Sequence, residues 1–411
     1  MSTLYRADWI LPIESPPIHD GWVLVDERRI AEVGAGPPPP VRNEATLGSV
    51  AVLPGLVNAH THLELSGMRG RVPPSSRVSG WIRDLMRLRR EGHRDDPLAM
   101  AAAVGELRRC GTSLVGDITN TFASFHALAA SPIGGCVFYE LLGFNHPRPA
   151  ERVAEAAAMT REANRRAADA GSSGAGLPGP RVRASVVPHA PYSVSPALFR
   201  EIAALAEAEQ WVTSVHLGES AEEIEFLRTG RGPWRDLIEE LGVWNDGWRA
   251  PGCGPVAYLD TLSALTRRTL IVHGVQLTDD DLARVRDRGA TVVTCPRSNE
   301  WVGAGQAPIA RFYASGVRVA VGTDSLASCP DLNLFSELAA MRRLAPDVPA
   351  SRLLHSATLA GAEALGCAGE HGALSAGRRA DLIAVGVPAG TTDVEECLCS
   401  GIQPDSVRWL A

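Results

Sequence analysis

Two histidines stand two positions apart in the segment NAHTHLE, directly after an apolar run. On an extended backbone, residues i and i+2 point to the same face, so the imidazoles of His60 and His62 project side by side. Imidazole nitrogen is a preferred ligand of Zn²⁺ and is also used by Fe(II). The pair therefore predicts part of a metal site at the end of a strand.

Four more polar residues each close an apolar run of strand character: His189, His216, His273 and Asp324. A single histidine in such a place is more often a hydrogen-bonded polar group than a ligand. The other six histidines fall in predicted helices or loops: His19, His93, His126, His146, His355 and His371. The shared placement of five of the eleven histidines with one aspartate predicts one common site, and the other six are expected to be structural.

The elements that must position these residues are short apolar runs that alternate with alanine-rich amphipathic stretches, a pattern typical of βα units and a parallel sheet. A typical (β/α)8 barrel takes about 250 residues and carries its active site at the carboxyl ends of its strands. We therefore expect an α/β fold with a (β/α)8 TIM barrel over residues 55–366. The eight predicted strands are Gly55–Asn58, Ser113–Asp117, Cys136–Glu140, Arg183–Val187, Val212–His216, Thr269–His273, Thr291–Thr294 and Arg318–Gly322.

Local signals mark some of the connections. Ser195 followed by Pro196 predicts a helix start, and Thr278 and Gly289 predict the start and end of another helix. Residues 171–180 are predicted to form a loop. Residues 1–54 and 367–411 return to strand character, and together they predict a small β-sandwich domain built from both termini.

Composition narrows the function classes. With a formal charge of −7 and a pI near 5.9, the chain offers no basic surface for nucleic acid or an anionic membrane, so a small-molecule substrate is expected. The sequence shows no secretory leader and no long apolar run, which predicts a cytoplasmic protein. Eight scattered cysteines without a CxxC pair indicate reduced thiols.

The 40 basic residues are all arginine. Without lysine, the chain cannot form a Schiff base, anchor pyridoxal phosphate, build a P-loop, or bridge two metals through a carbamylated lysine. The chemistry must therefore come from histidine, aspartate, glutamate and a metal ion.

Several motifs, in this order along the chain, resemble the deaminase branch of the amidohydrolase superfamily: LPGLVNAHTHLELSGMRG, VVPHAPYSVSP, SVHLGES, IVHGVQL, AVGTDSLAS and ADLIAV. The resemblance implies that His60, His62, His216 and Asp324 bind one divalent metal ion per chain. Zn is the first expectation, and Fe(II) is compatible with the same ligands. It also implies that His273 lies beside the metal and its water. Because the family often forms homodimers, the resemblance implies a homodimer here as well.

Glu219 stands three positions after His216, as in the HxxE of cytosine and adenosylhomocysteine deaminases. The alternative is a solvated surface glutamate, which is the interpretation for Glu222, Glu223 and Glu225 as a charged helix face. A metal lowers the pKa of its bound water toward about 7. The expected reaction is attack on an aminated ring carbon, with Glu219 protonating the ring nitrogen and Asp324 and His273 taking the proton of the water before ammonia leaves.

The resemblance also suggests substrate contacts. Ser328 matches a purine-contacting serine and His189 a substrate-binding histidine of the same branch, while Glu140 and Arg297 lie near strand ends. HLGESAEEIEFLRTGRG, CPRSN and GTDSLAS are most similar to aminodeoxyfutalosine deaminases, which remove the 6-amino group of an adenosine-type nucleoside in menaquinone biosynthesis.

Other functions stay open at this point. The same metal site serves deaminases of adenosylhomocysteine or methylthioadenosine and triazine chlorohydrolases, and a substrate panel separates them. Hydrolysis of a cyclic amide would make Glu219 less necessary. A non-enzymatic barrel scaffold would carry no stoichiometric metal, although no expected ligand is missing from this sequence.

Overall fold

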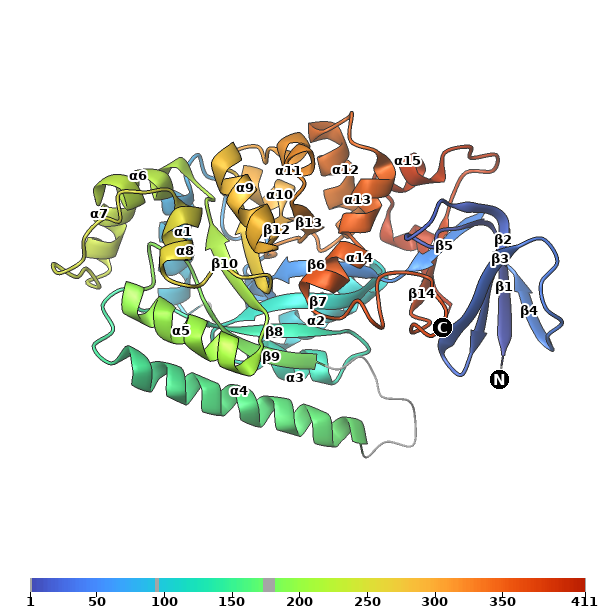
Figure 1. Cartoon of the computed structure of the whole chain (residues 1–411), viewed down its shortest axis with the longest axis horizontal. Helices are drawn as coiled ribbons and strands as arrows, with labels where there is room; N and C mark the ends of the chain where they lie inside the picture. Colours follow the sequence, from blue (N-terminus) through green and yellow to red (C-terminus); the bar gives the residue numbers. More distant parts are fainter. Residues whose placement is uncertain (1, 93–95, 173–181, 411) are drawn as a thin grey trace.

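The computed structural model describes residues 2–92, 96–172 and 182–410. His93 and most of the predicted loop 171–180 lie outside these residues. The described chain forms two parallel four-stranded sheets and one mixed seven-stranded sheet. Figure 1 shows the seven-stranded sheet at one end of the molecule, where both chain termini lie.

The two parallel sheets contain all eight strands expected from the sequence, in sequential order. The first sheet consists of β6 (Leu56–Thr61), β7 (Thr112–Thr119), β8 (Gly134–Leu141) and β9 (Val182–Pro188). The second consists of β10 (Thr213–Leu217), β11 (Thr269–His273), β12 (Thr291–Thr294) and β13 (Arg318–Val321). Every residue of β7, β8, β11 and β12 is buried, as expected of parallel strands covered on both faces. The predicted α/β class is therefore confirmed.

The two sheets meet along both of their edges. At one seam, His216 N donates to the carbonyl oxygen of His189 over 2.9 Å. At the other, Asp324 N donates to the carbonyl oxygen of His60 over 3.1 Å, and Thr61 and Asp324 form a parallel bridge. One cluster of buried apolar side chains joins strands of both sheets and includes Val57, Phe138, Leu270, Val293 and Ala320. The carboxyl ends of the strands are thereby held close to one another.

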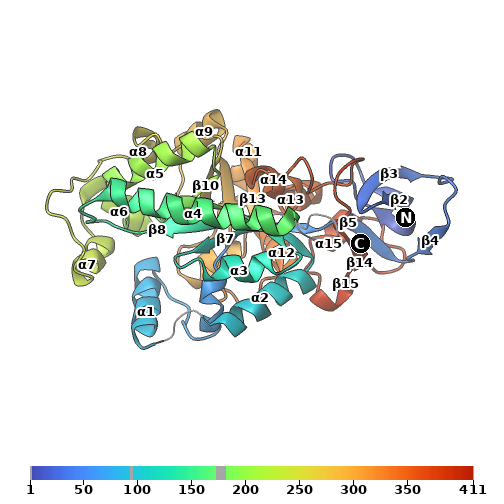
Figure 2. The ribbon, with the colours of Figure 1, turned by 90° about the horizontal axis from the view of Figure 1, so that it is seen from below.

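Helices connect and cover these strands. In Figure 2, α4 runs along the outside of the molecule, and both α4 and α5 contact β9. The helices are η1 (Leu63–Met68), α1 (Val78–Arg90), α2 (Pro97–Arg109), α3 (Ala123–Ala129), α4 (Pro149–Ser172), α5 (Pro196–Glu209), α6 (Ala221–Thr229), α7 (Pro233–Glu240), α8 (Pro255–Thr261), α9 (Asp279–Arg288), α10 (Pro296–Trp301), α11 (Ile309–Ser315), α12 (Leu334–Leu344), α13 (Ala350–Ser356), α14 (Leu359–Ala364), α15 (Val394–Leu398) and η2 (Pro404–Ser406). In the described part of the chain, none of them has the length and apolar character that a bilayer crossing requires.

The predicted helix boundaries are confirmed where the sequence carried a capping signal. Ser195 Oγ accepts a hydrogen bond from Leu198 N at the start of α5. Thr278 caps α9, and Gly289 ends it with a φ of 70°.

Strands from both ends of the chain form the seven-stranded sheet. Its order is β15-β14-β5-β1-β2-β3, with β4 also paired to β1. Its strands are β1 (Thr3–Ile10), β2 (Ile18–Asp26), β3 (Arg29–Ala35), β4 (Asn43–Thr46), β5 (Val50–Pro54), β14 (Leu382–Gly386) and β15 (Val407–Trp409). The sequence pattern does not predict β4 or β15, because β4 is polar with no buried residue and β15 has three residues. Neither carries a hydrophobic pattern, and their pairing partners define them.

Substitution of Gly322 tests the close contact between the two parallel sheets where β13 meets β6. A Cβ atom on Gly322 would lie 2.6 Å from the carbonyl oxygen of His60 and 2.9 Å from its backbone nitrogen. We expect Gly322→Ala to lower the free energy of unfolding by roughly 1–3 kcal/mol, since the backbone of β6 must shift. Urea unfolding measures the change. Gly369→Ala is the matched control, because no atom lies within 4 Å of its added Cβ. Equal unfolding midpoints for the two variants would contradict the tight seam.

Candidate metal and catalytic site

Three of the predicted metal ligands converge from β6 and from the segment after β13. His60 Nε2 and His62 Nε2 lie 3.2 Å apart. Asp324 Oδ1 lies 3.4 Å from His62 Nε2 and 3.7 Å from His60 Nε2. Two nitrogens bound to one zinc ion at about 2.0–2.1 Å with tetrahedral angles lie about 3.3 Å apart, which is close to the observed spacing. These three side chains can therefore share one ion.

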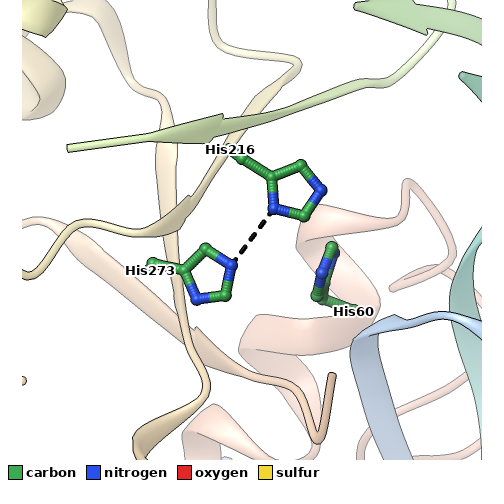
Figure 3. A group of neighbouring side chains, drawn as sticks. All are labelled: His60, His216 and His273. Atoms are coloured by element: carbon green, nitrogen blue, oxygen red, sulfur yellow. Dashed lines mark hydrogen bonds between the residues drawn. The ribbon is translucent and has the colours of Figure 1, made fainter. Parts of the chain in front are cut away.

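His216 and His273 extend the site from β10 and β11, as Figure 3 shows. His216 Nδ1 lies 3.1 Å from His273 Nε2, and His273 Nδ1 lies 2.7 Å from Asn299 Oδ1. Because the amide oxygen of Asn299 can only accept, His273 carries its proton on Nδ1 and its Nε2 accepts the proton of His216 Nδ1. These two hydrogen bonds leave the lone pair of His216 on Nε2. His60, His216 and His273 form a second group whose ligand atoms lie within 4.8 Å of one another.

The charge states suit metal binding. Burial lowers the pKa of His60 and His62 to about 4 and that of His216 to about 3. These imidazoles are therefore neutral at pH 7, which is the form that binds a metal. Burial alone would raise the pKa of Asp324, but the facing imidazoles of His60 and His62 hold it well below its usual range.

Buried polar atoms at this point also fit an ion. Among the described residues, His60 Nδ1, His216 Nε2 and Glu140 Oε1 are buried without a hydrogen-bond partner. Unpaired buried polar groups are rare in folded proteins and call for a ligand or an ion. The donor set of imidazole and carboxylate suits Zn²⁺ or Fe(II). The residues present therefore fit the expected divalent metal.

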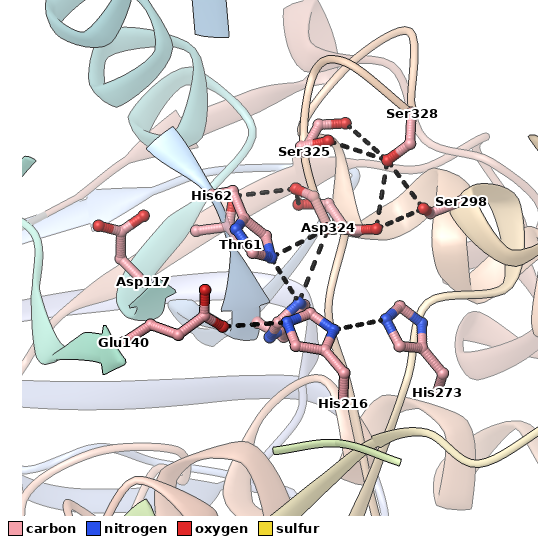
Figure 4. A network of polar contacts seen from close by, with 12 residues as sticks. Thr61, His62, Asp117, Glu140, His216, His273, Ser298, Asp324, Ser325 and Ser328 are labelled. Atoms are coloured by element: carbon pink, nitrogen blue, oxygen red, sulfur yellow. Dashed lines mark hydrogen bonds and ion pairs between the residues drawn. The ribbon is translucent and has the colours of Figure 1, made fainter. Parts of the chain in front are cut away.

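Hydroxyl groups hold the second oxygen of Asp324. Ser298 Oγ donates to Asp324 Oδ2 over 2.5 Å, and Ser328 Oγ donates to the same oxygen over 3.2 Å (Figure 4). Oδ1 is thus left to face the histidines. Ser328, predicted to bind substrate, is completely buried and also contacts Ser298 and Ser325. The structure places it behind Asp324, where it orients this carboxylate.

Two site residues have a backbone conformation that side chains rarely adopt. His273 has a φ of 73° and Asp324 a φ of 60°, and both directly end or follow a strand. Left-handed backbone at a non-glycine residue costs about 1–3 kcal/mol and persists where the surrounding structure enforces it. Packing at the strand ends stabilises both residues in orientations that serve the site.

Glu140 and His189 form the neighbouring part of the site. Glu140 Oε1 lies 3.5 Å from His216 Nε2, and His189 Nδ1 lies 2.5 Å from Ser193 Oγ. The side chains of Glu140, His189 and His216 make a third group of candidate ligand atoms. Burial would raise the pKa of Glu140, but His189 and His216 hold it well below its usual range. Asn120 Nδ2 donates to Glu140 Oε2 over 3.1 Å and fixes its position.

Glu219 lies in the loop between β10 and α6, with its carboxylate directed into the site. Its Oε1 is 3.7 Å from His273 Nε2, and the residue is only 6% exposed. Burial raises the pKa of Glu219 above its usual value. The carboxyl group therefore keeps a proton to a higher pH than an exposed glutamate.

The prediction of a solvated helix face after Glu219 is wrong for two of its three residues. Glu223 is completely buried, and its carboxylate accepts hydrogen bonds from the backbone. Glu222 is partly buried and accepts hydrogen bonds from Ser79 N and Oγ at the start of α1. Only Glu225 is exposed. The packing of α6 against other elements buries residues that the charge pattern alone assigns to solvent.

A cavity of about 320 Å³, open to solvent, connects these residues. Its polar end is lined by His62, Asn120, Glu140, His189, His216, Glu219, Asp324 and Ser325. Helix α1 supplies most of the apolar wall, together with neighbouring residues: Leu65, Val78, Trp81, Ile82, Leu85, Met86, Leu142 and Tyr192. Arg89 also lines it. The cavity is thus large enough for a substrate with a polar reacting end and an apolar remainder.

Arg297, predicted to bind substrate, is not among the residues that line this cavity. Its guanidinium pairs with Glu337 at 2.6 Å and Asp331 at 2.9 Å. The five described histidines expected to be structural also lie outside the cavity lining: His19, His126, His146, His355 and His371.

Sequence reasoning did not identify the supporting residues Asn120, Ser298 and Asn299, nor the wall formed by α1. Each of the three polar residues comes shortly after the end of a parallel strand, as the predicted ligands do. Their position after a strand end is the sequence feature that could have identified them. No such feature marks the wall formed by α1, because its residues form an ordinary amphipathic pattern.

Comparison with known proteins supports the motif-based resemblance. Residues 51–403 match the model of the amidohydrolase family. The chain is 35% identical over 336 residues to an aminodeoxyfutalosine deaminase of Deinococcus radiodurans, covering 79% of this chain and 75% of that protein. It is 31% identical to a 5-methylthioadenosine/S-adenosylhomocysteine deaminase of Nitratidesulfovibrio vulgaris, covering 90% and 79%. The crystal structure of an adenosine deaminase from Xanthomonas campestris with bound zinc superposes with a TM-score of 0.79 at 26% identity, covering 98% of this chain and 90% of that one.

Replacing a predicted ligand tests the metal site. We expect His62→Asn and Asp324→Asn each to lower the bound metal and the hydrolytic rate together, because each removes a direct bond to the ion. Metal per chain is measured by elemental analysis after dialysis. His19→Asn, an exposed histidine in the terminal sheet, is the control and should keep full metal. Full metal and full activity in either ligand variant would overturn that assignment.

Proposed function

We propose, since this chain belongs to the amidohydrolase family, that it is a metal-dependent deaminase that removes the 6-amino group of an adenosine-type nucleoside. The observation that carries this proposal is the placement of Glu219. A buried carboxyl group with a raised pKa lines the same cavity as three of the predicted metal ligands, His62, His216 and Asp324. Deamination of a purine needs such an acid, because the ring nitrogen next to the reacting carbon must gain a proton.

Each residue then has a defined task. His60, His62, His216 and Asp324 would hold the divalent ion, which would supply the Lewis acidity that makes a water molecule reactive near neutral pH. Asp324 Oδ1 is the acceptor placed to receive the proton that this water would lose, and His273 orients His216 beside it, because His273 Nε2 accepts from His216 Nδ1. Glu219 donates its proton to the ring nitrogen, and a proton returned to the exocyclic amine lets ammonia leave. His189 and Glu140 contact the ring edge at the polar end of the cavity.

The finer parts of the proposal follow from the same set of residues. The ion is Zn²⁺, with Fe(II) as the alternative, and each chain binds one ion, since the chain has no lysine to bridge a second. The eight parallel strands form a closed (β/α)8 barrel over residues 55–366, which the backbone hydrogen bonds at both seams support. Residues 1–54 and 367–411 form a small β-sandwich domain.

The protein is cytoplasmic and forms a homodimer. Its mass in solution tests the homodimer.

The cavity favours an adenosine derivative over a free base. Its polar end can hold an aminated purine, while the wall formed by α1 offers Trp81, Leu85 and other apolar side chains to the remainder of the molecule. Burial of apolar surface contributes about 25 cal/mol per Å², so a substituent on the ribose adds affinity there. Aminodeoxyfutalosine, the substrate named for the Deinococcus relative, is the proposed substrate, and the reaction belongs to menaquinone biosynthesis.

One of the alternative functions has support from a relative. Deamination of methylthioadenosine or adenosylhomocysteine uses the same ring chemistry and is supported by the Nitratidesulfovibrio relative. An atrazine chlorohydrolase and triazine hydrolase variants share the fold at 20–22% identity, which carries no argument for substrate. The clustered His and Asp side chains argue against a scaffold without metal.

Glu219→Gln tests the proton donor. The amide keeps the size of the side chain but cannot release a proton, so kcat should fall by roughly 100-fold or more while metal content stays unchanged. The pH dependence has a definite sign. The protonated form of Glu219 is lost as pH rises through its raised pKa, so the rate of the native enzyme should decline there, and the variant should lack this decline.

Glu225→Gln serves as the matched control, because Glu225 is an exposed glutamate on the adjacent helix. It should keep the native rate and pH profile. Near-native turnover in Glu219→Gln would show that another group protonates the ring, and it would favour hydrolysis of a cyclic amide.

A substrate panel tests the choice of nucleoside. Ammonia release is compared, as kcat/KM, for aminodeoxyfutalosine, adenosine, methylthioadenosine, adenosylhomocysteine, adenine, cytosine and a chlorotriazine. We expect aminodeoxyfutalosine to be best, since polar groups in the cavity reject analogues that leave them unpaired. A different adenosine derivative in first place would remove only the pathway assignment. A pyrimidine or triazine in first place would refute the purine assignment and leave the metal site standing.

A further inference from the structure

The end of β10 and the loop that joins it to α6 carry two functional residues within four positions. His216, in β10, lies in the metal site, and Glu219, in the loop, lies in the cavity, with Leu217 and Gly218 between them. Gly218 has a φ of 62°, and a Cβ on it would lie 2.7 Å from Leu277 Cδ2. The carbonyl oxygen of Gly218 accepts a hydrogen bond of 2.7 Å from Gln276 N. The loop is therefore a tight turn whose backbone must be held from several sides.

Glu223 holds the other side of this turn. It is the third residue of α6, and its carboxylate accepts hydrogen bonds from Gly218 N at 2.9 Å and Glu219 N at 3.0 Å. Each backbone amide uses one of its two oxygens. Glu223 is completely buried. Its carboxylate thus holds the backbone of the proposed proton donor, Glu219, and of the residue before it.

This arrangement differs from ordinary helix capping. In a capping box, the third residue of the helix returns its side chain to the backbone N–H of the N-cap. Ser220 is the N-cap here, and its Oγ accepts from Glu223 N over 3.2 Å, as a capping box requires. The carboxylate of Glu223 instead bonds to Gly218 and Glu219, which precede the cap. The contact stabilises the catalytic loop and not merely the first turn of α6.

Burial of this carboxyl group has a substantial cost. Desolvation raises the pKa of Glu223, whereas the two backbone N–H groups, which can only donate, favour its charged form. A glutamine would fit the same space without that cost, but it has one acceptor and would turn its NH₂ group toward the second backbone N–H. Two acceptor oxygens are therefore the property that this position requires.

From this geometry we infer that Glu223 is a positioning residue for deamination, which fixes the backbone of Gly218 and Glu219 so that the acid of Glu219 faces the substrate. Glu223 does not line the cavity and acts through Glu219. The inference rests on the proposed function for its catalytic consequence, but the hydrogen-bonded clamp itself does not depend on it.

A double-mutant cycle tests the inference. Glu223→Gln should lower kcat by about 10- to 100-fold with KM and bound metal nearly unchanged, since a small displacement of a catalytic group has effects of that size. In a Glu219→Gln background, Glu223→Gln should change kcat by less than about twofold, because residues that act through one another are not additive. Independent, multiplying effects would overturn the inference, and so would loss of metal from Glu223→Gln.

Hydrogen–deuterium exchange supplies a readout that needs no activity. The amides of Gly218 and Glu219 should exchange faster in metal-loaded Glu223→Gln than in the native protein, and at the native rate in Glu225→Gln. Unchanged exchange in Glu223→Gln would overturn the clamp. If Glu223→Gln does not fold, Glu223→Asp is read in the same way, since its shorter side chain cannot reach both amides. If no adenosine derivative is deaminated, the proposed function fails and exchange alone decides the clamp.

Discussion

The site depends on two backbone hydrogen bonds that join the parallel sheets at their seams. His60 accepts from Asp324 at one seam, and His189 accepts from His216 at the other. All four residues also place their side chains in the site, so the bonds that join the sheets set the spacing of the functional groups. Side-chain direction in a strand follows from backbone register, and a change at either seam would move a candidate ligand.

The electrostatics of the site follow from this crowding. Several imidazoles and carboxylates are buried within a few ångströms of one another, and burial disfavours the charged form of each. The histidines respond by staying neutral, whereas Asp324 and Glu140 stay ionised beside them. The result is a set of lone pairs and negative charges in three overlapping groups, which a divalent cation would partly neutralise. Glu219 lies at the edge of this set, and its raised pKa separates its chemistry from that of Asp324.

A surrounding layer of residues decides the orientation of these groups. Ser298 and Ser328 hold one oxygen of Asp324, and Asn299 sets the proton of His273. Such supporting contacts commonly matter nearly as much as the ligands themselves. Helix α1 has a different task, since it contributes apolar wall and no ligand. In the proposed function, reaction chemistry and substrate selection are thus assigned to different elements.

The sequence by itself determined the α/β class, all eight parallel strands and the residues that converge at their ends. Those features are local, because strand periodicity and the position of a histidine at a strand end are visible without the partner strands. Tertiary structure decided what depends on distant neighbours. Ser328 became a support for Asp324, Arg297 paired with Glu337 and Asp331, and Glu223 moved from an expected surface to the interior. Packing between segments far apart in the chain sets the surroundings of each of these residues. The residue type alone does not predict which segment will lie next to it.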